Sequence, residues 1–219
     1  MIRACIFDLD GVIVDTARYH FLAWRRLANE LGFDFGEEKN EALKGVGRME
    51  SLEKILAWGG LEKTEAEKKE LTELKNGWYQ EFVSKMKPDE ILEGVTPFLA
   101  ELDEKGIRKA VGSSSRNAQL VIRQIELEDT FEVVIDGNKL TRSKPDPQVF
   151  QLAAEAMALP PDECIVFEDA ASGVEAALNG GFFAVGVGKP QHLGEAHLVI
   201  PGFAGLTYEE VLKELPGHP

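Results

Sequence analysis

Two carboxylates separated by one residue, Asp8 and Asp10, follow the first apolar run of the chain, and Gly11 comes directly after them. The run Ile6-Phe7 predicts a buried strand, and in an open α/β sheet ligands bind beyond the carboxyl ends of the strands. Neighbouring carboxylates repel each other unless they share a cation or their pKa values are split. A hard cation such as Mg²⁺ prefers oxygen ligands, so the pattern predicts magnesium-assisted chemistry. The alternative is a polar turn after a strand.

Hydroxyl groups and a lysine follow two later apolar runs. The segment Ser113-Ser114-Ser115-Arg116-Asn117 leads into a helical pattern, and hydroxyl and backbone N–H groups at a helix N-terminus bind anions. Lys144 lies in a short loop in which Pro145 and Pro147 restrict the backbone. We expect anion-binding groups at both places, although N-capping serines and solvated loop lysines are each common alone.

A second acidic pair, Glu168-Asp169, follows the apolar run Val166-Phe167 and precedes a helical pattern. It matches the first pair by position, because both pairs stand where a predicted strand ends. Two more carboxylates at this edge of the sheet are expected to complete a metal site. The alternative is favourable negative charge near a helix N-terminus.

Short apolar runs alternate with helical patterns over most of the chain. The runs are apolar nearly throughout, as expected of parallel strands that are covered on both faces. We predict strands at Ala4–Phe7, Lys109–Gly112, Val133–Ile135, Cys164–Phe167, Phe183–Val187 and Leu198–Ile200, and helices at Thr96–Lys105, Arg116–Ile125, Pro147–Ala158 and Ala171–Asn179. This alternation predicts an α/β fold with a doubly wound, Rossmann-like parallel sheet.

One stretch, residues 16–87, interrupts the alternation because it contains helical patterns only. The expected helices there are Thr16–Leu31, Glu37–Leu43, Met49–Trp58 and Thr64–Lys85. The stretch is too long for a simple crossover between two strands. We therefore predict an α/β core domain of residues 1–15 and 88–219, and an inserted α-helical cap domain of residues 16–87 that is joined by hinge-like linkers.

The net charge of −14 and the isoelectric point near 4.8 limit the classes of partner. Such a surface repels nucleic acids and anionic membranes, so we expect neither as a partner. The sequence has no run of eighteen apolar residues that would predict a membrane span, and Asp8 and Asp10 interrupt the short apolar N-terminus, so no signal peptide is expected. We expect a cytoplasmic protein whose two cysteines, Cys5 and Cys164, are buried and form no disulfide.

An acid pair, a hydroxyl, a lysine and a second acid pair thus occur in this order, each at the end of a predicted core strand. This arrangement resembles the haloacid dehalogenase superfamily, and the resemblance spans the whole chain. The four signatures of the superfamily correspond here to Asp8-x-Asp10, Ser113, Lys144 and Glu168-Asp169.

The resemblance implies a role for each of these residues. Asp8 would be the nucleophile that forms an aspartyl-phosphate, and Asp10 the general acid and base. The four acidic residues would bind Mg²⁺, with Asp10 contributing its backbone carbonyl. Ser113 and Lys144 would offset charge on the transferring phosphoryl group.

Three features of the predicted cap are similar to those of the β-phosphoglucomutases within that superfamily. His20 and Trp24 lie four residues apart and share a helix face, which alone would also fit a packed pair that faces the core. The loop Lys44-Gly45-Val46-Gly47-Arg48 places basic residues around glycines, which suits a sugar phosphate. Lys75-Asn76 lies within a later helix, and the tail Val185–Pro190 is also similar to that of the family.

This chain departs from the family pattern at two positions. Gly47 stands where serine is expected, and the loss of its hydroxyl loosens the loop. Arg116 stands where lysine is expected, but it keeps the positive charge and can bind phosphate through two hydrogen bonds.

The resemblance implies interconversion of β-D-glucose 1-phosphate and D-glucose 6-phosphate through β-glucose 1,6-bisphosphate. The residues that it assigns to substrate binding are His20, Trp24, Lys44, Gly45, Val46, Arg48, Ser51, Lys75, Ser114, Ser115, Arg116 and Asn117. We expect a monomer that acts on small sugar phosphates and whose cap closes to favour a sugar hydroxyl over water. Two alternatives stay open: a sugar-phosphate phosphatase, and a non-catalytic sensor, against which the retained Asp8 and Asp10 argue.

Overall fold

The computed structural model describes residues 1–43 and 46–216 of the chain. The chain forms two compact units, residues 1–15 with 86–219 and residues 16–85. The second unit ends at Lys85 rather than at Lys87, because the chain from Met86 onward groups with the first unit. Within the described residues, no helix combines the length and the apolar character needed to cross a membrane.

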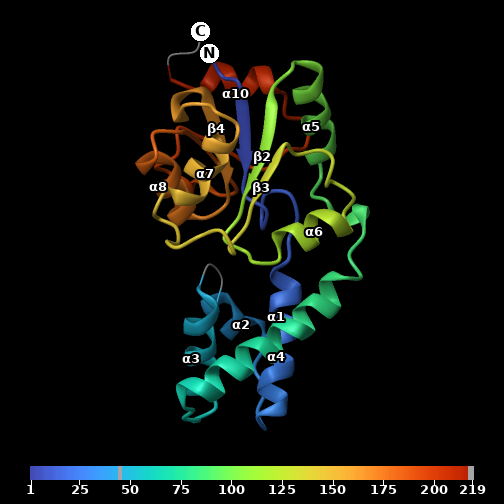
Figure 1. Ribbon diagram of the computed structural model, residues 1–219, viewed down its shortest axis with the longest axis vertical. Coiled ribbons are helices and arrows are strands. Elements are labelled where there is room, and N and C mark those ends of the chain that lie inside the picture. The colour runs from blue at the N-terminus through green and yellow to red at the C-terminus, as the bar shows by residue number, and fades with distance from the viewer. Residues whose placement is uncertain (44–45, 217–219) are drawn as a thin grey trace. The chain divides into compact units, whose positions relative to one another are not determined.

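The first unit is built on one sheet of six parallel strands (Figure 1). The strands are β1 (Ala4–Phe7), β2 (Arg108–Gly112), β3 (Val133–Ile135), β4 (Cys164–Glu168), β5 (Phe183–Val187) and β6 (Leu198–Ile200). Their order in the sheet is β3-β2-β1-β4-β5-β6. In this order the chain builds one half of the sheet outward from β1 and then returns to build the other half, which confirms the predicted doubly wound α/β core.

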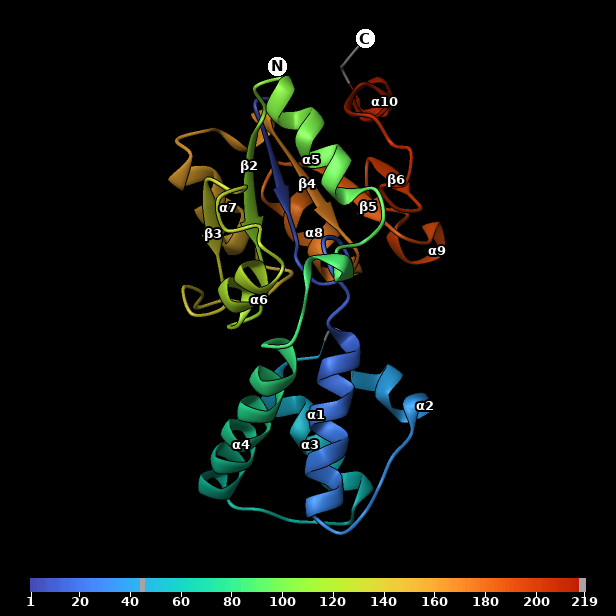
Figure 2. The same ribbon diagram turned by 90° about the vertical axis from the view of Figure 1, so that its right-hand side faces the viewer.

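Helices cover both faces of this sheet (Figures 1 and 2). They are α5 (Val95–Glu104), α6 (Ala118–Gln124), α7 (Gln148–Ala156), α8 (Ala171–Asn179), α9 (Pro190–Leu193) and α10 (Tyr208–Glu214), with 3₁₀ turns at Pro88–Glu90 and Pro161–Glu163. On one face, Ile6 of β1 packs in a buried cluster with Phe150 of α7. On the other face, Phe7 stacks on Phe167 at a centroid distance of 4.9 Å and meets Phe98 of α5 edge-on at 6.4 Å. The strands consist mostly of apolar residues because both faces are covered, and the exceptions are Arg108 and Lys109 at the start of β2 and Glu168 at the end of β4.

The two cysteines lie on neighbouring strands but on opposite faces of the sheet. Ala4 of β1 pairs with Cys164 of β4, so alternation of side chains along a strand directs Cys5 to the other face. Both thiols are free and buried, and burial raises the pKa of Cys164 to about 11. Neither thiol is therefore poised as a nucleophile.

The second unit is helical and consists of α1 (Ala17–Glu30), α2 (Glu37–Asn40), α3 (Arg48–Trp58) and α4 (Glu65–Val83), with a 3₁₀ turn at Glu41–Leu43. Helices α1 and α4 lie side by side (Figure 2), and α3 also contacts α4. Helix α4 begins after Thr64, whose hydroxyl accepts from the N–H of Glu67 at 3.3 Å while the Glu67 carboxylate accepts from the N–H of Thr64 at 2.8 Å. This capping box satisfies two backbone donors of the first turn.

The two connections to the insertion are tied together inside the first unit. Val14 and Ile91 form an antiparallel bridge, and the N–H of Leu92 donates to the carbonyl of Ile13 at 2.9 Å. The chain therefore leaves the first unit and returns to it at adjacent points.

Helix ends account for most differences between the predicted and observed elements. Helix α6 begins at Ala118 rather than at Arg116, because the preceding residues form a turn in which the Ser115 hydroxyl accepts from the N–H of Asn117 at 3.2 Å. The short helices α9 and α10 were not predicted, although Thr207 and Glu210 form a capping box at the start of α10.

Replacement of Gly77 by alanine is expected to stabilise the second unit by about 0.5–1 kcal/mol. Gly77 is exposed in α4, and an added methyl group would meet nothing within 4 Å. Urea unfolding can be followed by tryptophan fluorescence, because all three tryptophans lie in residues 16–85. Gly59→Ala is the opposite control in the same unit, since a Cβ at Gly59 would overlap the ring of Phe33. A lower urea midpoint for Gly77→Ala would contradict the expectation.

Candidate active site

Three neighbouring strands bring the acidic and hydroxyl residues to one edge of the sheet. Asp8 follows β1, Glu168 ends β4, and Ser113 follows β2. Because β2, β1 and β4 are adjacent and parallel, their carboxyl ends meet at the same edge. The N–H of Asp8 donates to the carbonyl of Phe167 at 2.9 Å, which continues the ladder up to the acidic residues.

Asp8, Glu168 and Asp169 form a cluster in which one carboxylate oxygen of each lies within 4.8 Å of the others. Asp8 and Glu168 are buried, whereas Asp169 is exposed at the rim. Lys144, from the loop before α7, places its Nζ 2.5 Å from Asp8 Oδ1 and 2.7 Å from Glu168 Oε2. The structure thus brings together three predicted metal ligands and the predicted lysine.

The charges of this cluster do not balance. Three carboxylates against one ammonium leave two negative charges uncompensated when all four groups are ionised. Burial raises the pKa of Glu168 above its usual value, by more than the Lys144 charge lowers it. Burial alone would lower the pKa of Lys144, but the charges of Asp8 and Glu168 outweigh it and raise that pKa. An all-oxygen site with two excess negative charges fits a hard divalent cation such as Mg²⁺.

Two glycines provide the space for the carboxylates. A Cβ on Gly11, which has φ +77°, would overlap the carboxyl group of Asp169, and a Cβ on Gly173 would overlap that of Glu168. Neither glycine was predicted to have a role. Their positions within the two acidic motifs were the available signal, because a glycine is needed where another group approaches the backbone closely.

Gly173→Ala is therefore expected to weaken Mg²⁺ binding by about tenfold or more, because it displaces the Glu168 carboxylate from its position. Isothermal titration with MgCl₂ measures this directly, and Gly77→Ala is the matched control for a glycine-to-alanine change within a helix. Equal Mg²⁺ affinity in both variants would show that Glu168 is not a ligand.

Asp10 lies in the turn that follows Asp8 and is only partly buried. The residue forms a bridge with Val14, and the N–H of Gly11 donates to the carbonyl of Val14 at 2.7 Å. The carboxylate cluster of the described residues does not include the Asp10 side chain. Its two expected roles, a contribution to the metal through its carbonyl and proton transfer through its carboxyl group, stay predictions.

The loop between β2 and α6 is held in place by its own polar groups. The Ser113 hydroxyl, which is buried, accepts from the N–H of Ser115 at 3.1 Å. It therefore keeps its own O–H as a donor for an anionic oxygen. The carbonyls of Ser115 and Arg116 accept from Gly137 N and Asn138 Nδ2 at 3.0 and 2.9 Å. Ser114 and Asn117 belong to the same turn, with Asn117 buried at the start of α6.

In the second unit, the predicted residues of α1 and α4 meet each other. Lys75 Nζ lies 2.8 Å from His20 Nδ1 and 4.5 Å from the ring centroid of Trp24. Lys75 is only 3% exposed. Burial lowers its pKa to about 7, and the charge of Arg48 contributes. Burial also lowers the pKa of His20 well below its usual value, with smaller effects from Lys75 and Arg48. Just below pH 7 this pair therefore consists mostly of a charged lysine and a neutral imidazole.

Arg48 begins α3 and reaches α4. Its Nη2 donates to Asn76 Oδ1 at 2.9 Å, and its Nη1 lies 3.8 Å from Glu73 Oε1. The Ser51 hydroxyl is buried and donates to the carbonyl of Val46 at 3.4 Å, which ties the loop to α3. Two other predicted binding residues, Lys44 and Gly45, lie outside the described residues.

A profile of the haloacid dehalogenase-like hydrolase family matches residues 2–181. The chain belongs to this family. Its sequence is 44% identical over 214 residues to a β-phosphoglucomutase of Bacillus subtilis (strain 168), and this match covers 97% of the chain and 95% of that protein. It is also 33% identical over 217 residues to a phosphorylated carbohydrates phosphatase of Thermotoga maritima, with 97% of the chain and 98% of that protein covered.

A solved structure of the β-phosphoglucomutase from Clostridium difficile matches this haloacid dehalogenase-like protein with a TM-score of 0.89 and 38% identity. The match covers 98% of this chain and 97% of that one. Within the haloacid dehalogenase-like family, the protein is therefore an enzyme homologous to the β-phosphoglucomutases, and the resemblance inferred from the motifs is confirmed.

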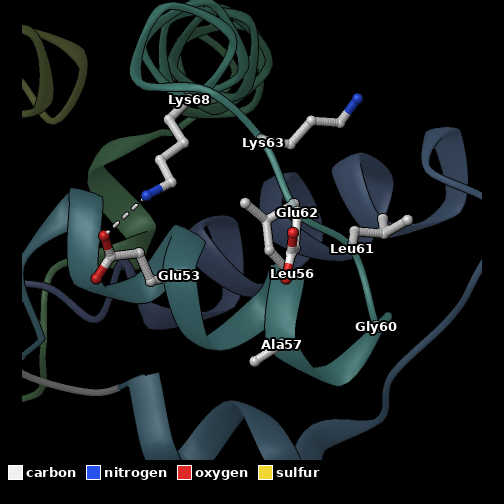
Figure 3. Close-up of a pocket in the computed structure, with 8 residues that line it drawn as sticks. All are labelled: Glu53, Leu56, Ala57, Gly60, Leu61, Glu62, Lys63 and Lys68. Atoms are coloured by element: carbon white, nitrogen blue, oxygen red, sulfur yellow. Dashed lines mark hydrogen bonds and ion pairs between the residues drawn. The ribbon is translucent and has the colours of Figure 1, made fainter.

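One hollow of about 610 Å³ in the second unit contains none of the predicted site residues (Figure 3). It lies between the end of α3 and the start of α4 and is lined by Glu53, Leu56, Ala57, Gly60, Leu61, Glu62, Lys63 and Lys68. Lys68 Nζ lies 3.2 Å from Glu53 Oε1 and 2.7 Å from Glu65 Oε1, and Lys63 pairs with Glu67 at 3.1 Å. These lysines are matched by carboxylates, so the hollow lacks the excess positive charge that a sugar phosphate requires.

Proposed function

We propose that the protein is a β-phosphoglucomutase that interconverts β-D-glucose 1-phosphate and D-glucose 6-phosphate through β-glucose 1,6-bisphosphate. The observation that carries this proposal is the full-length similarity to a β-phosphoglucomutase, and the cluster of three acids and a lysine at the edge of the sheet supports it.

In the proposed reaction, an Asp8 oxygen attacks the phosphorus of the bisphosphate and forms an aspartyl-phosphate. Asp10 gives its proton to the departing sugar oxygen, so the leaving group departs as a hydroxyl. In the reverse half-reaction, Asp10 takes the proton from the hydroxyl of the bound sugar phosphate, and that oxygen accepts the phosphoryl group from Asp8. Asp8 is then restored, and atoms and protons balance over the two steps.

The groups around Asp8 are suited to the charge that this reaction moves. Lys144 is held between Asp8 and Glu168, with its charged form favoured by both carboxylates. Ser113 would donate its O–H to a phosphoryl oxygen. Asp8, Glu168 and Asp169, with the Asp10 carbonyl, would hold Mg²⁺, which when bound would neutralise charge on the phosphoryl oxygens.

Each unit contains a guanidinium that can bind a phosphate group. Arg48, oriented by Asn76, supplies a guanidinium in the second unit, and Arg116 supplies another in the loop after β2. A guanidinium binds two phosphate oxygens at once. Lys75 and His20 would help to position the sugar.

The second candidate is a sugar-phosphate phosphatase, which the similarity to the Thermotoga maritima phosphatase favours. It would use the same Asp8 chemistry but transfer the phosphoryl group to water.

A coupled assay separates the two candidates. The protein is incubated with Mg²⁺, β-glucose 1-phosphate and a trace of glucose 1,6-bisphosphate, and glucose 6-phosphate and inorganic phosphate are measured together. Glucose 6-phosphate without an equal amount of inorganic phosphate supports the mutase. Release of inorganic phosphate alone would reject the mutase and favour the phosphatase.

The proposal also covers the oligomeric state and the cellular location of the protein. We propose a cytoplasmic monomer of 24.2 kDa that acts on small sugar phosphates. Its buried, free cysteines suit a reducing compartment. Sedimentation equilibrium tests the monomer, and a molar mass of twice this value would reject it.

A further inference from the structure

Lys75 is enclosed by aromatic rings as well as by His20. Its Nζ lies 4.5 Å from the ring centroid of Trp24 and 5.1 Å from that of Tyr79. The Tyr79 ring also stacks on the His20 ring, with centroids 4.1 Å apart and planes 25° apart. Trp24 is 3% exposed and Tyr79 is fully buried. Two helices thus supply a cradle of rings for one ammonium group, with Trp24 and His20 from α1 and Tyr79 from α4.

No carboxylate forms an ion pair with Lys75 among the described residues. The titratable and charged groups that face it there are His20 on α1, Arg48 on α3 and the phenol of Tyr79 on its own helix. Arg48 is repulsive and the other two are neutral. Burial deprives the Lys75 ammonium of its attraction to water. The negative faces of the Trp24 and Tyr79 rings replace part of that attraction.

The contact between Lys75 and His20 fixes the imidazole. A charged lysine has three donors and no acceptor, so His20 Nδ1 must accept in the 2.8 Å contact. In a neutral imidazole the proton then resides on Nε2. A neutral Lys75 amine, by contrast, has a lone pair and can accept from Nδ1–H. A charged Lys75 therefore requires the Nε2–H tautomer of His20, whereas a neutral Lys75 permits either tautomer.

We propose that Trp24 and Tyr79 are positioning residues: their ring faces hold Lys75 in its charged form against His20 Nδ1 and thereby keep His20 as the Nε2–H tautomer. In this role Trp24 acts through Lys75 and not by contact with the sugar. The kinetic consequence rests on the proposed function, whereas the tautomer is a property of the protein itself.

The lowered pKa of Lys75, about 7, sets the pH at which the Lys75 charge and the tautomer preference of His20 change. Below that pH the lysine is charged and His20 carries its proton on Nε2. Above it the lysine loses its charge, and the second tautomer becomes accessible. Loss of a ring face removes attraction for the charged form only, so it lowers the pKa of Lys75 further, by about one pH unit for a desolvated cation–π contact.

The first test is ¹⁵N NMR of the ring nitrogens on the full chain without substrate. His20→Gln identifies the His20 signals among those of the four histidines. Wild-type protein is expected to show the Nε2–H tautomer at pH 6 and a change with a midpoint near pH 7. An Nδ1–H tautomer at pH 6 would overturn the proposal, whatever reaction the protein catalyses.

The second test compares ring-preserving with ring-removing variants. Trp24→Leu and Tyr79→Leu are expected to shift the NMR midpoint, and the high-pH limb of kcat/KM, to lower pH by about one unit. Trp24→Phe and Tyr79→Phe keep a ring face and are expected to restore most of the wild-type position. If a Leu variant fails to fold, the Phe variants still test the proposal. Each is expected to show both the wild-type NMR midpoint and the Nε2–H tautomer at pH 6, and an Nδ1–H tautomer at pH 6 would contradict it.

Trp78→Leu is the matched control. Trp78 is a buried tryptophan of α4, the helix that carries Lys75. Its ring centroid lies 4.3 Å from the guanidinium carbon of Arg26, and arginine does not titrate in this pH range. Its removal is expected to leave the midpoint unchanged. Equal shifts in Trp78→Leu and Trp24→Leu would show a general loss of packing and would reject the positioning role. A normal NMR response without mutase activity would reject the proposed function alone.

Discussion

Asp8→Asn is expected to abolish turnover, by more than about 10⁴-fold, while the protein stays folded. The amide cannot form an aspartyl-phosphate, and no other carboxylate of the cluster follows β1. The fold is expected to tolerate the change because Lys144 keeps Glu168 as a partner at 2.7 Å. One of three crowded carboxylates is also removed, so the melting temperature without Mg²⁺ is expected to stay equal or to rise.

Two measurements check this result. The coupled assay reports turnover, and a thermal scan with and without Mg²⁺ reports the metal-dependent stabilisation, which is expected to shrink because one ligand is lost. Asp129→Asn, which alters an exposed carboxylate of the first unit, is the matched control and is expected to change neither. Residual turnover near the wild-type level in Asp8→Asn would reject the nucleophile.

Lys75→Met is expected to make the protein less active but more stable. Methionine fills a similar volume without a charge, and a buried charge that no carboxylate balances lowers stability. We expect a gain of about 1–2 kcal/mol in unfolding free energy. Loss of a cation from the sugar-phosphate site is expected to lower kcat/KM by about 10²-fold.

The pH dependence of this gain follows from the lowered pKa of Lys75. Its value is about 7 in the folded protein, against an ordinary 10.5 in the unfolded chain. Between these values the unfolded state binds more protons, so wild-type stability rises with pH. The advantage of Lys75→Met is therefore largest below pH 7 and declines toward pH 10.5.

Urea unfolding at pH 6 and pH 9, followed by tryptophan fluorescence, measures both effects. Lys68→Met is the matched control on the same helix, because Lys68 already pairs with Glu53 and Glu65. It is expected to show no gain at either pH. Destabilisation of Lys75→Met at pH 6 would mean that the Lys75 charge is compensated in the folded protein.

The core of the first unit was predictable because its strands are short, apolar runs that end in polar residues. The predicted strand Cys164–Phe167 differs from β4 only by the addition of Glu168. Parallel strands must align their carboxyl ends, so the gathering of Asp8, Ser113 and Glu168 at one edge also follows from the sequence. The position of Lys144 between two carboxylates does not, because it depends on the path of an irregular loop.

The surroundings of Lys75 could be predicted only in part. Residues 20 and 24, and residues 75 and 79, are each four apart, so each pair shares a face of its own helix. Which face of α1 meets which face of α4 is decided by tertiary packing, and a single sequence does not reveal it. The same holds for Gly11 and Gly173, because the space that each leaves is occupied by a side chain distant in sequence.

The hydrogen bond from the N–H of Leu92 to the carbonyl of Ile13 joins the two chain segments that flank the helical insertion. Because the two ends of the insertion are already neighbours, a short turn can replace the entire stretch between them without distorting the sheet. The α/β unit then serves as a constant scaffold, and the helical insertion, residues 16–85, as an exchangeable part. Selectivity for different phosphorylated compounds can accordingly evolve by replacement of the insertion, while the residues that carry out phosphoryl transfer stay in place.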